Sequence, residues 1–125
     1  MPRHHHHHHH EIDHVTHRFF PVRAIKELLL LSIIREKPIH GSEIYRVLRD
    51  RYGLDVPKPI IYMLLRRMEE RGLIISEWEM SERGPVKRIY RITEEGLDYL
   101  NDSVERLRKL RNIINDILSK LTSEE

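Results

Sequence analysis

Residues 57–72, PKPIIYMLLRRMEERG, form the stretch that decides the fold of this chain. Proline suits the first turn of a helix and glycine accepts the left-handed conformation that often ends one, so Pro57 and Gly72 bracket a predicted helix. An apolar stripe recurs at the spacing of one helix face, at Ile61, Leu64, Leu65 and Met68. The opposite face carries Pro59, Tyr62, Met63, Arg66, Arg67 and Glu70. A helix with one buried stripe and one basic face is suited to a groove of DNA.

A predicted β-hairpin follows this helix. Residues 73–80, LIISEWEM, and residues 86–92, VKRIYRI, have the alternation of strands, and Gly84 with Pro85 supplies the turn between them. From residue 83 to residue 91 the hairpin carries four basic residues and no acid, at Arg83, Lys87, Arg88 and Arg91. A helix followed by a basic hairpin predicts a winged helix-turn-helix, which is mainly α with a small β-hairpin (α+β).

Two further helices are predicted upstream. Residues 24–36, AIKELLLLSIIRE, end before Pro38 and are apolar nearly all round, so this helix is expected to be buried on more than one side. Residues 42–51, SEIYRVLRDR, form the second helix, and a short loop joins it to the helix at 57–72 as in a helix-turn-helix. We expect His40 to cap or pack against the second helix. We expect Trp78, the only tryptophan, to pack on a half-buried strand.

The carboxy-terminal third predicts one long helix. Thr93, followed by two glutamates, is a good helix start, and the helix is expected to continue to about Leu121. Its heptad seam is Leu97, Leu100, Val104, Leu107, Ile114, Leu118 and Leu121, broken once at Arg111. At 1.5 Å per residue the helix would be roughly 40 Å long, too long for this small body to cover.

The exposed seam needs a partner, and a second copy of the chain is the simplest one. The alternative is that the long helix folds back on the helix at 24–36 of the same chain. A two-fold pair of winged helices also matches the two halves of a palindromic site. The residues expected to form the homodimer are Leu30, Ile34, Leu100, Val104, Leu107, Ile114, Leu118 and Leu121.

Composition limits the function. The chain of 125 residues divides into a histidine-rich segment at 1–18, a winged-helix domain at 19–92 and a dimerisation helix at 93–125. There is no cysteine, which excludes disulfides and thiolate chemistry, and there is no apolar run of about 20 residues to span a membrane. The formal charge of +2 makes the placement of charge, and not its sum, the useful signal. No glycine-rich phosphate loop or convergent acid–base pair is present, so we expect neither an enzyme nor a bound cofactor.

Seven consecutive histidines, His4 to His10, are typical of a purification tag and do not enter the fold prediction. A native metal-binding tract is the alternative, because imidazole nitrogens bind divalent transition metals. A metal-responsive regulator that uses His14, His17 and His40 therefore stays open. So does a winged helix whose basic face binds an acidic protein.

From about Ala24 to Leu121 the chain resembles the PadR-type transcriptional regulators, in the smaller subgroup with a single carboxy-terminal helix. The most specific matches are His40-Gly41, Tyr62, Arg66 with Arg67, the run 69–73, Trp78 and the run 90–96. The resemblance implies a dimeric, cytoplasmic repressor or activator. It places the helix at 58–71 in the major groove of double-stranded DNA and the wing at 81–88 on the backbone or minor groove.

The resemblance fails at the start of the DNA-binding helix. Pro57, Pro59 and Ile60 stand where the family usually has serine, glycine and threonine, and proline has no amide to offer a phosphate. We therefore expect the charge of Lys58 to substitute for that contact. The predicted DNA contacts are phosphate contacts from Lys58, Arg83, Lys87 and Arg88, and base-edge contacts from Tyr62, Met63, Arg66 and Arg67. A small-molecule effector stays open but has no support in the sequence, because members of the family that sense such molecules hold them with aromatic residues and the long helix offers only Tyr99.

Overall fold

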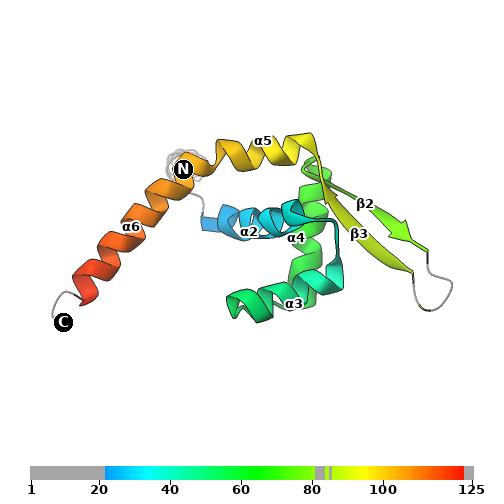
Figure 1. Ribbon diagram of the computed structural model, residues 1–125, viewed down its shortest axis with the longest axis horizontal. Helices are drawn as coiled ribbons and strands as arrows, with labels where there is room; N and C mark the ends of the chain where they lie inside the picture. The colour runs from blue at the N-terminus through cyan, green and yellow to red at the C-terminus, as the bar shows by residue number, and fades with distance from the viewer. Residues whose placement is uncertain (1–21, 81–83, 85, 123–125) are drawn as a thin grey trace, which may run out of the picture. The chain divides into compact units, whose positions relative to one another are not determined.

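The computed structural model describes residues 22–80, 84 and 86–122, and it confirms a mainly helical fold with a small antiparallel sheet (Figure 1). The elements are α2 (Val22–Glu36), β1 (Ile39–His40), α3 (Gly41–Tyr52), α4 (Lys58–Glu70), β2 (Ile74–Glu79), β3 (Lys87–Ile92), α5 (Glu94–Asp102) and α6 (Val104–Thr122). The unit Lys26–Asn101 holds the core and the winged helix, and α6 belongs to a second unit. In the described part of the chain, no helix is both long and apolar enough to cross a bilayer.

Helix α4 is the predicted DNA-binding helix, and its boundaries follow the proline and glycine signals. Pro57 is the N-cap residue, and Gly72 follows the last turn with a φ of 78°. The chain leaves the helix through hydrogen bonds from the Gly72 amide to the Glu69 carbonyl and from the Leu73 amide to the Met68 carbonyl, both 3.0 Å long. The four residues of the predicted apolar stripe are all buried.

The core of the unit Lys26–Asn101 is formed by α2, α3, α4 and one face of the sheet. Leu30 and Ile34 on α2 are 2% and 1% exposed within this single chain. The prediction that these two residues contact a second chain is therefore wrong, since their surface is already covered. An apolar helix can be buried by its own domain as readily as by a partner.

The sheet has the strand order β1-β3-β2, and the short strand β1 was not predicted. Strand β3 pairs with β2 so that Ser76 lies opposite Tyr90 and Trp78 lies opposite Arg88. Tyr90 is buried, but Trp78, two pairs farther toward the tip, is 60% exposed. The prediction that Trp78 packs as a half-buried residue is wrong, because burial on this face of the hairpin ends at the Ser76–Tyr90 pair.

Helix α5 begins where it was predicted. The Thr93 hydroxyl accepts a hydrogen bond from the Gly96 amide at 3.0 Å and donates one to the Gly72 carbonyl at 2.6 Å. Gly96 packs directly against the backbone of Leu73. These contacts place α5, as far as Asn101, in the same compact unit as the winged helix.

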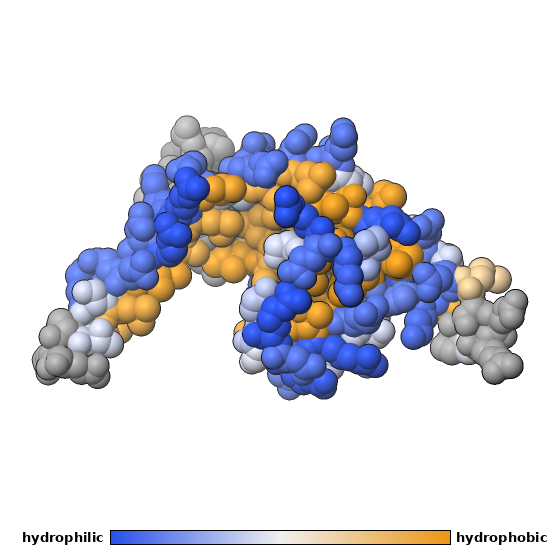
Figure 2. All heavy atoms as spheres, in the orientation of Figure 1, coloured by the Kyte–Doolittle hydropathy of each residue, from blue (hydrophilic) through white to orange (hydrophobic). Residues whose placement is uncertain are grey.

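The predicted single long helix is wrong, because it is interrupted at Ser103. The Ser103 carbonyl accepts the Leu107 amide at 3.0 Å, so the residue opens a new helix, α6. Helix α6 has 19 residues, or roughly 28 Å at 1.5 Å per residue, and none of them is buried. Figure 2 shows apolar atoms along one side of this helix and hydrophilic atoms along the other.

Candidate nucleic-acid interface

The exposed face of α4 carries the side chains that were predicted to meet bases. Tyr62 and Met63 are 40% and 41% exposed, and Arg66 is also exposed. Arg67 is half-buried and has less surface to offer a ligand. Lys58 lies at the start of the helix, where its ammonium group is 5.3 Å from the centre of the Tyr45 ring. This cation–π contact holds the charge of Lys58 near the helix entrance.

The backbone at the amino terminus of α4 offers few amide groups that could donate a hydrogen bond to a ligand. The amides of Ile60 and Ile61 both donate to the Pro57 carbonyl, at 3.0 and 3.2 Å, and Pro59 has no amide hydrogen. A helix amino terminus usually binds anions through such amides. Here the side-chain charge of Lys58 is the main feature that would attract a phosphate.

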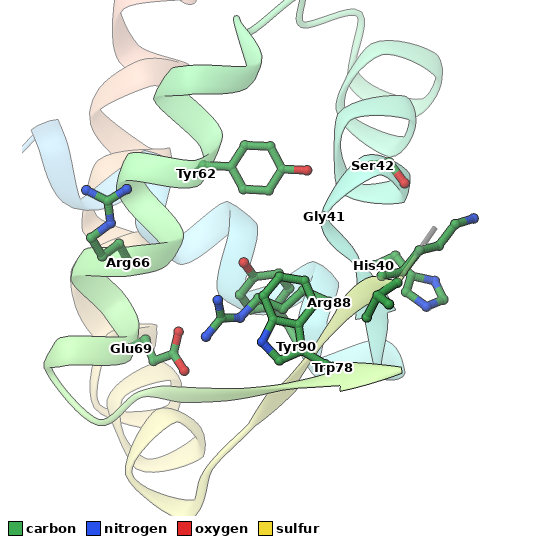
Figure 3. A pocket seen from close by; sticks show the side chains of 11 residues that line it. His40, Gly41, Ser42, Tyr62, Arg66, Glu69, Trp78, Arg88 and Tyr90 are labelled. Carbon is green, nitrogen blue, oxygen red and sulfur yellow. The ribbon is translucent and has the colours of Figure 1, made fainter. Parts of the chain in front are cut away.

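A cavity of about 650 Å³ lies between α4, the start of α3 and the inner face of β2 and β3 (Figure 3). Its lining is His40, Gly41, Ser42, Tyr62, Arg66, Glu69, Trp78, Val86, Lys87, Arg88 and Tyr90. It brings together four predicted DNA contacts, Tyr62, Arg66, Lys87 and Arg88. Lys58, Met63 and Arg67 lie on α4 outside this lining, and Arg83 lies outside the described residues.

Tyr62 points from α4 toward Gly41 at the start of α3 (Figure 3). A Cβ atom on Gly41 would lie 2.7 Å from Cε1 of Tyr62 and 2.9 Å from its hydroxyl oxygen. The ring therefore occupies space that any other residue at position 41 would fill. The missing side chain of Gly41 allows α3 and the ring to approach this closely.

Arg88 is held by two contacts in the floor of the cavity. Its Nε atom donates to the Ser76 hydroxyl at 2.7 Å, and that hydroxyl donates to Glu69 Oε2, also at 2.7 Å. The guanidinium carbon of Arg88 lies 5.0 Å from the centre of the Trp78 ring. Ser76 and Glu69 were not predicted as site residues. The cross-strand register places Ser76 beside Arg88, and α4 brings Glu69 to Ser76.

His40 lies at the other end of the cavity, where both of its ring nitrogens face carboxylates. Nδ1 is 2.7 Å from Glu43 Oε1 and Nε2 is 3.2 Å from Glu79 Oε1. The hydrogen bond from His40 lowers the pKa of the Glu43 carboxyl. His40 is also the N-cap residue of α3, which confirms its predicted capping position.

The described residues hold no group of three or more side chains suited to a metal ion, and His14 and His17 lie outside them. Tyr90 is a buried residue of the cavity lining, and burial raises the pKa of its hydroxyl. The described lining therefore provides hydrogen-bond donors, positive charge and aromatic surface. Such a surface is suited to binding a polyanion.

Comparison with known proteins identifies the family. The sequence profile of the transcriptional regulator PadR-like family matches residues 30–102. A transcriptional regulator of Mycobacterium tuberculosis is 31% identical over 88 residues, which cover 70% of this chain and 80% of the relative. A crystal structure from Thermoplasma acidophilum is 35% identical, with a TM-score of 0.72 over 77% of this chain and 92% of the other.

Bacillus subtilis PadR, solved in complex with operator DNA, is 20% identical, with a TM-score of 0.60 over 64% of this chain and 46% of that one. At this identity the likeness concerns the fold alone. The family consists of transcriptional regulators and not of enzymes. The matched profile covers more than half of the sequence, and this chain therefore belongs to the PadR-like family of transcriptional regulators.

Proposed function

We propose that this regulator binds double-stranded DNA in a sequence-dependent manner, with α4 in the major groove. The observation that carries the proposal is the division of α4 into two faces. One stripe is buried in the core, and the opposite face exposes Tyr62, Met63 and Arg66. A helix about 10–12 Å across fits the major groove, which is about 12 Å wide.

The charges divide into two roles under this proposal. Arg66 and Tyr62 project from the exposed face of α4 and meet base edges. Lys58 at the helix entrance and Lys87 with Arg88 on β3 bind phosphates on either side of the groove, which sets the register without reading sequence. Bacillus subtilis PadR, which has the same fold, was solved with operator DNA, which supports double-stranded DNA as the partner.

Selection of bound fragments from a random duplex library tests the proposal. The wild type should enrich a palindromic consensus with half-sites about one helical turn apart. Arg66→Ala should lose about 1–3 kcal/mol of preference for that consensus, because an arginine that contacts guanine through two hydrogen bonds is worth about that much. Arg51→Ala is the matched control, since Arg51 is an exposed arginine on α3 that pairs with Glu36 at 2.8 Å. Equal preference of Arg66→Ala and wild type for consensus over random DNA would refute the assignment.

A homodimer formed through α6 is the second part of the proposal. Apolar residues along this helix are exposed to water: Val104, Leu107, Ile114, Leu118 and Leu121 range from 36% to 76% exposed. Exposing a row of apolar side chains of this length to water is unfavourable in free energy, and a second copy of the same helix would cover it. Leu100, on α5, packs partly against the core of its own unit.

Sedimentation velocity tests the dimer. The wild type should sediment as a dimer, and Leu118→Glu should sediment as a monomer and lose its preference for palindromic over single half-sites. Asn112→Glu, an equal change of charge at an exposed polar position of α6, should remain dimeric. A wild type that stays monomeric at micromolar concentration would remove this part of the proposal.

A dimer bound across consecutive grooves would exclude polymerase from an overlapping promoter, so we assign the protein as a repressor. Its site of action is the cytoplasm, where a bacterial or archaeal chromosome is accessible. A promoter–reporter assay checks the sign of regulation: deleting the gene should raise reporter output.

A further inference from the structure

We propose that the cavity between α4 and the hairpin holds a phosphate of the DNA backbone on Arg88, and that Ser76, Glu69 and Trp78 are positioning residues that keep Arg88 ready for it. The inference rests on the proposed DNA binding and names the residues that make one contact effective. It concerns a hydrogen-bonded group that the sequence alone did not indicate.

The first observation is how Arg88 is held. Five other arginines of the described chain pair directly with carboxylates, and these are Arg49, Arg51, Arg71, Arg91 and Arg108. The hydrogen bond of Arg88 instead goes to the neutral Ser76 hydroxyl, at 2.7 Å. A direct ion pair would occupy the guanidinium and offset its charge, whereas a hydroxyl holds Arg88 and leaves the charge available to an anion.

The second observation is the role of Glu69. The Ser76 hydroxyl donates its only hydrogen to Glu69 Oε2 at 2.7 Å. This fixes the orientation of the hydroxyl, so that a lone pair is presented to Arg88 Nε. Glu69 therefore acts on Arg88 through Ser76.

The third observation is Trp78. It is 60% exposed, and its ring lies 5.0 Å from the Arg88 guanidinium carbon. A planar guanidinium stacks well on an indole face, and the stack restricts the remaining torsions of a long, flexible side chain. With Nε bound to Ser76 and one face on Trp78, the two terminal NH2 groups are left for the two oxygens of a phosphate. Figure 3 shows Arg88 and Trp78 together on the hairpin side of the cavity, across from Tyr62.

The binding partner follows from this geometry. An arginine side chain that is already ordered before binding loses less conformational entropy when it binds a phosphate. The cavity also contains Lys87 and is bordered by α4, which under the proposed function lies in the major groove. The DNA sugar–phosphate backbone that flanks the groove would then pass next to Arg88.

Titration of a labelled random-sequence duplex at several salt concentrations tests the proposal. Ser76→Ala should weaken binding roughly threefold to tenfold, because Arg88 must then be ordered on binding. The slope of log affinity against log salt should stay that of the wild type, since no charge is lost. Arg88→Ala should lower the magnitude of the slope by about 0.9, the value for one phosphate contact. Arg91→Ala is the matched control on the other face of β3, where Arg91 pairs with Glu77, and it should change affinity less than Arg88→Ala.

A double-mutant cycle separates positioning from a general effect on the fold. Ser76→Ala should cost nothing further when Arg88 is already alanine, whereas a collapsed wing would weaken both backgrounds. Ser76→Thr should restore wild-type affinity, because it keeps the hydroxyl and suits a strand. Trp78 is the sole tryptophan of the chain, so a change in tryptophan fluorescence when duplex DNA is added reports directly on this cavity.

Wild-type affinity in Ser76→Ala, or a full additional loss in the double variant, would overturn the inference while the wild type still binds DNA. A wild type without affinity for duplex would instead overturn the proposed function.

Discussion

Gly41→Ala tests whether the position of the Tyr62 ring matters for DNA binding. The added Cβ would lie 2.7 Å from Tyr62 Cε1, whereas ordinary van der Waals contact begins at 3.4 Å. The ring must therefore retreat by about 0.7 Å. It is free to do so, because Tyr62 is 40% exposed and the nearest atoms are the far end of its side chain.

The expected cost is different for folding and for binding. Alanine is favoured over glycine in a helix by up to about 1 kcal/mol, which offsets the displacement of the ring, so the free energy of unfolding should change by less than about 1 kcal/mol. A hydrogen bond or contact from Tyr62 to DNA depends strongly on geometry, and losing it should weaken binding by about 0.5–1.5 kcal/mol, or roughly twofold to tenfold.

Urea denaturation and fluorescence anisotropy with the selected duplex measure these two quantities. Tyr62→Ala supplies the control background, because the added Cβ then no longer meets the ring. In that background Gly41→Ala should leave DNA affinity unchanged. The reasoning would be refuted by an unchanged affinity in the single variant, or by an equal loss of affinity in both backgrounds.

Two predictions concern stability. Gly96→Ala should destabilise the fold by about 1–3 kcal/mol in urea denaturation, because its Cβ would collide with the Leu73 carbonyl oxygen, a backbone atom that cannot rotate away. Asn101→Ala on the same helix is the control. A loss of stability no larger than in this control would contradict the close packing of Gly96 on Leu73. Glu43→Gln should reduce stability at neutral pH, because the lowered pKa of Glu43 stabilises the fold above its ordinary value of 4.5. The difference between this variant and the wild type should shrink as the pH falls below 4.5, and a difference that is constant with pH in urea denaturation would contradict the contribution of the charge.

Periodicity within one segment predicted much of the fold. The stripe of α4 and the alternation of β2 and β3 depend on neighbours in sequence, and the structure places both as expected. The break at Ser103 was missed because the heptad spacing of apolar residues continues on both sides of it. Hydrophobic spacing indicates which face is apolar, but it does not show whether one helix or two carry that face.

Burial was harder to predict than periodicity. Leu30 and Ile34 sit on a helix that is apolar nearly all round, and the sequence does not indicate whether a partner or the same chain covers each side. The burial of Trp78 was mispredicted in the opposite direction. It was expected to be packed, because a large aromatic side chain usually is, but it is exposed. Its exposure depends on how far the helices extend along the hairpin, and that is a property of the tertiary fold.

The group around Arg88 depends on the register of two strands, which explains why the basic residue was predicted but its neighbours were not. Trp78 lies opposite Arg88, and Ser76 lies opposite Tyr90. Shifting the pairing by one residue would send Arg88 and its partners to opposite faces of the sheet. The alternation in each strand is compatible with several registers, and the buried Ile74 and Tyr90 select one of them by facing the core. The packing of the core therefore determines which residues hold the arginine, and a substitution at Ile74 that shifted the strand would disturb DNA binding without touching a basic side chain.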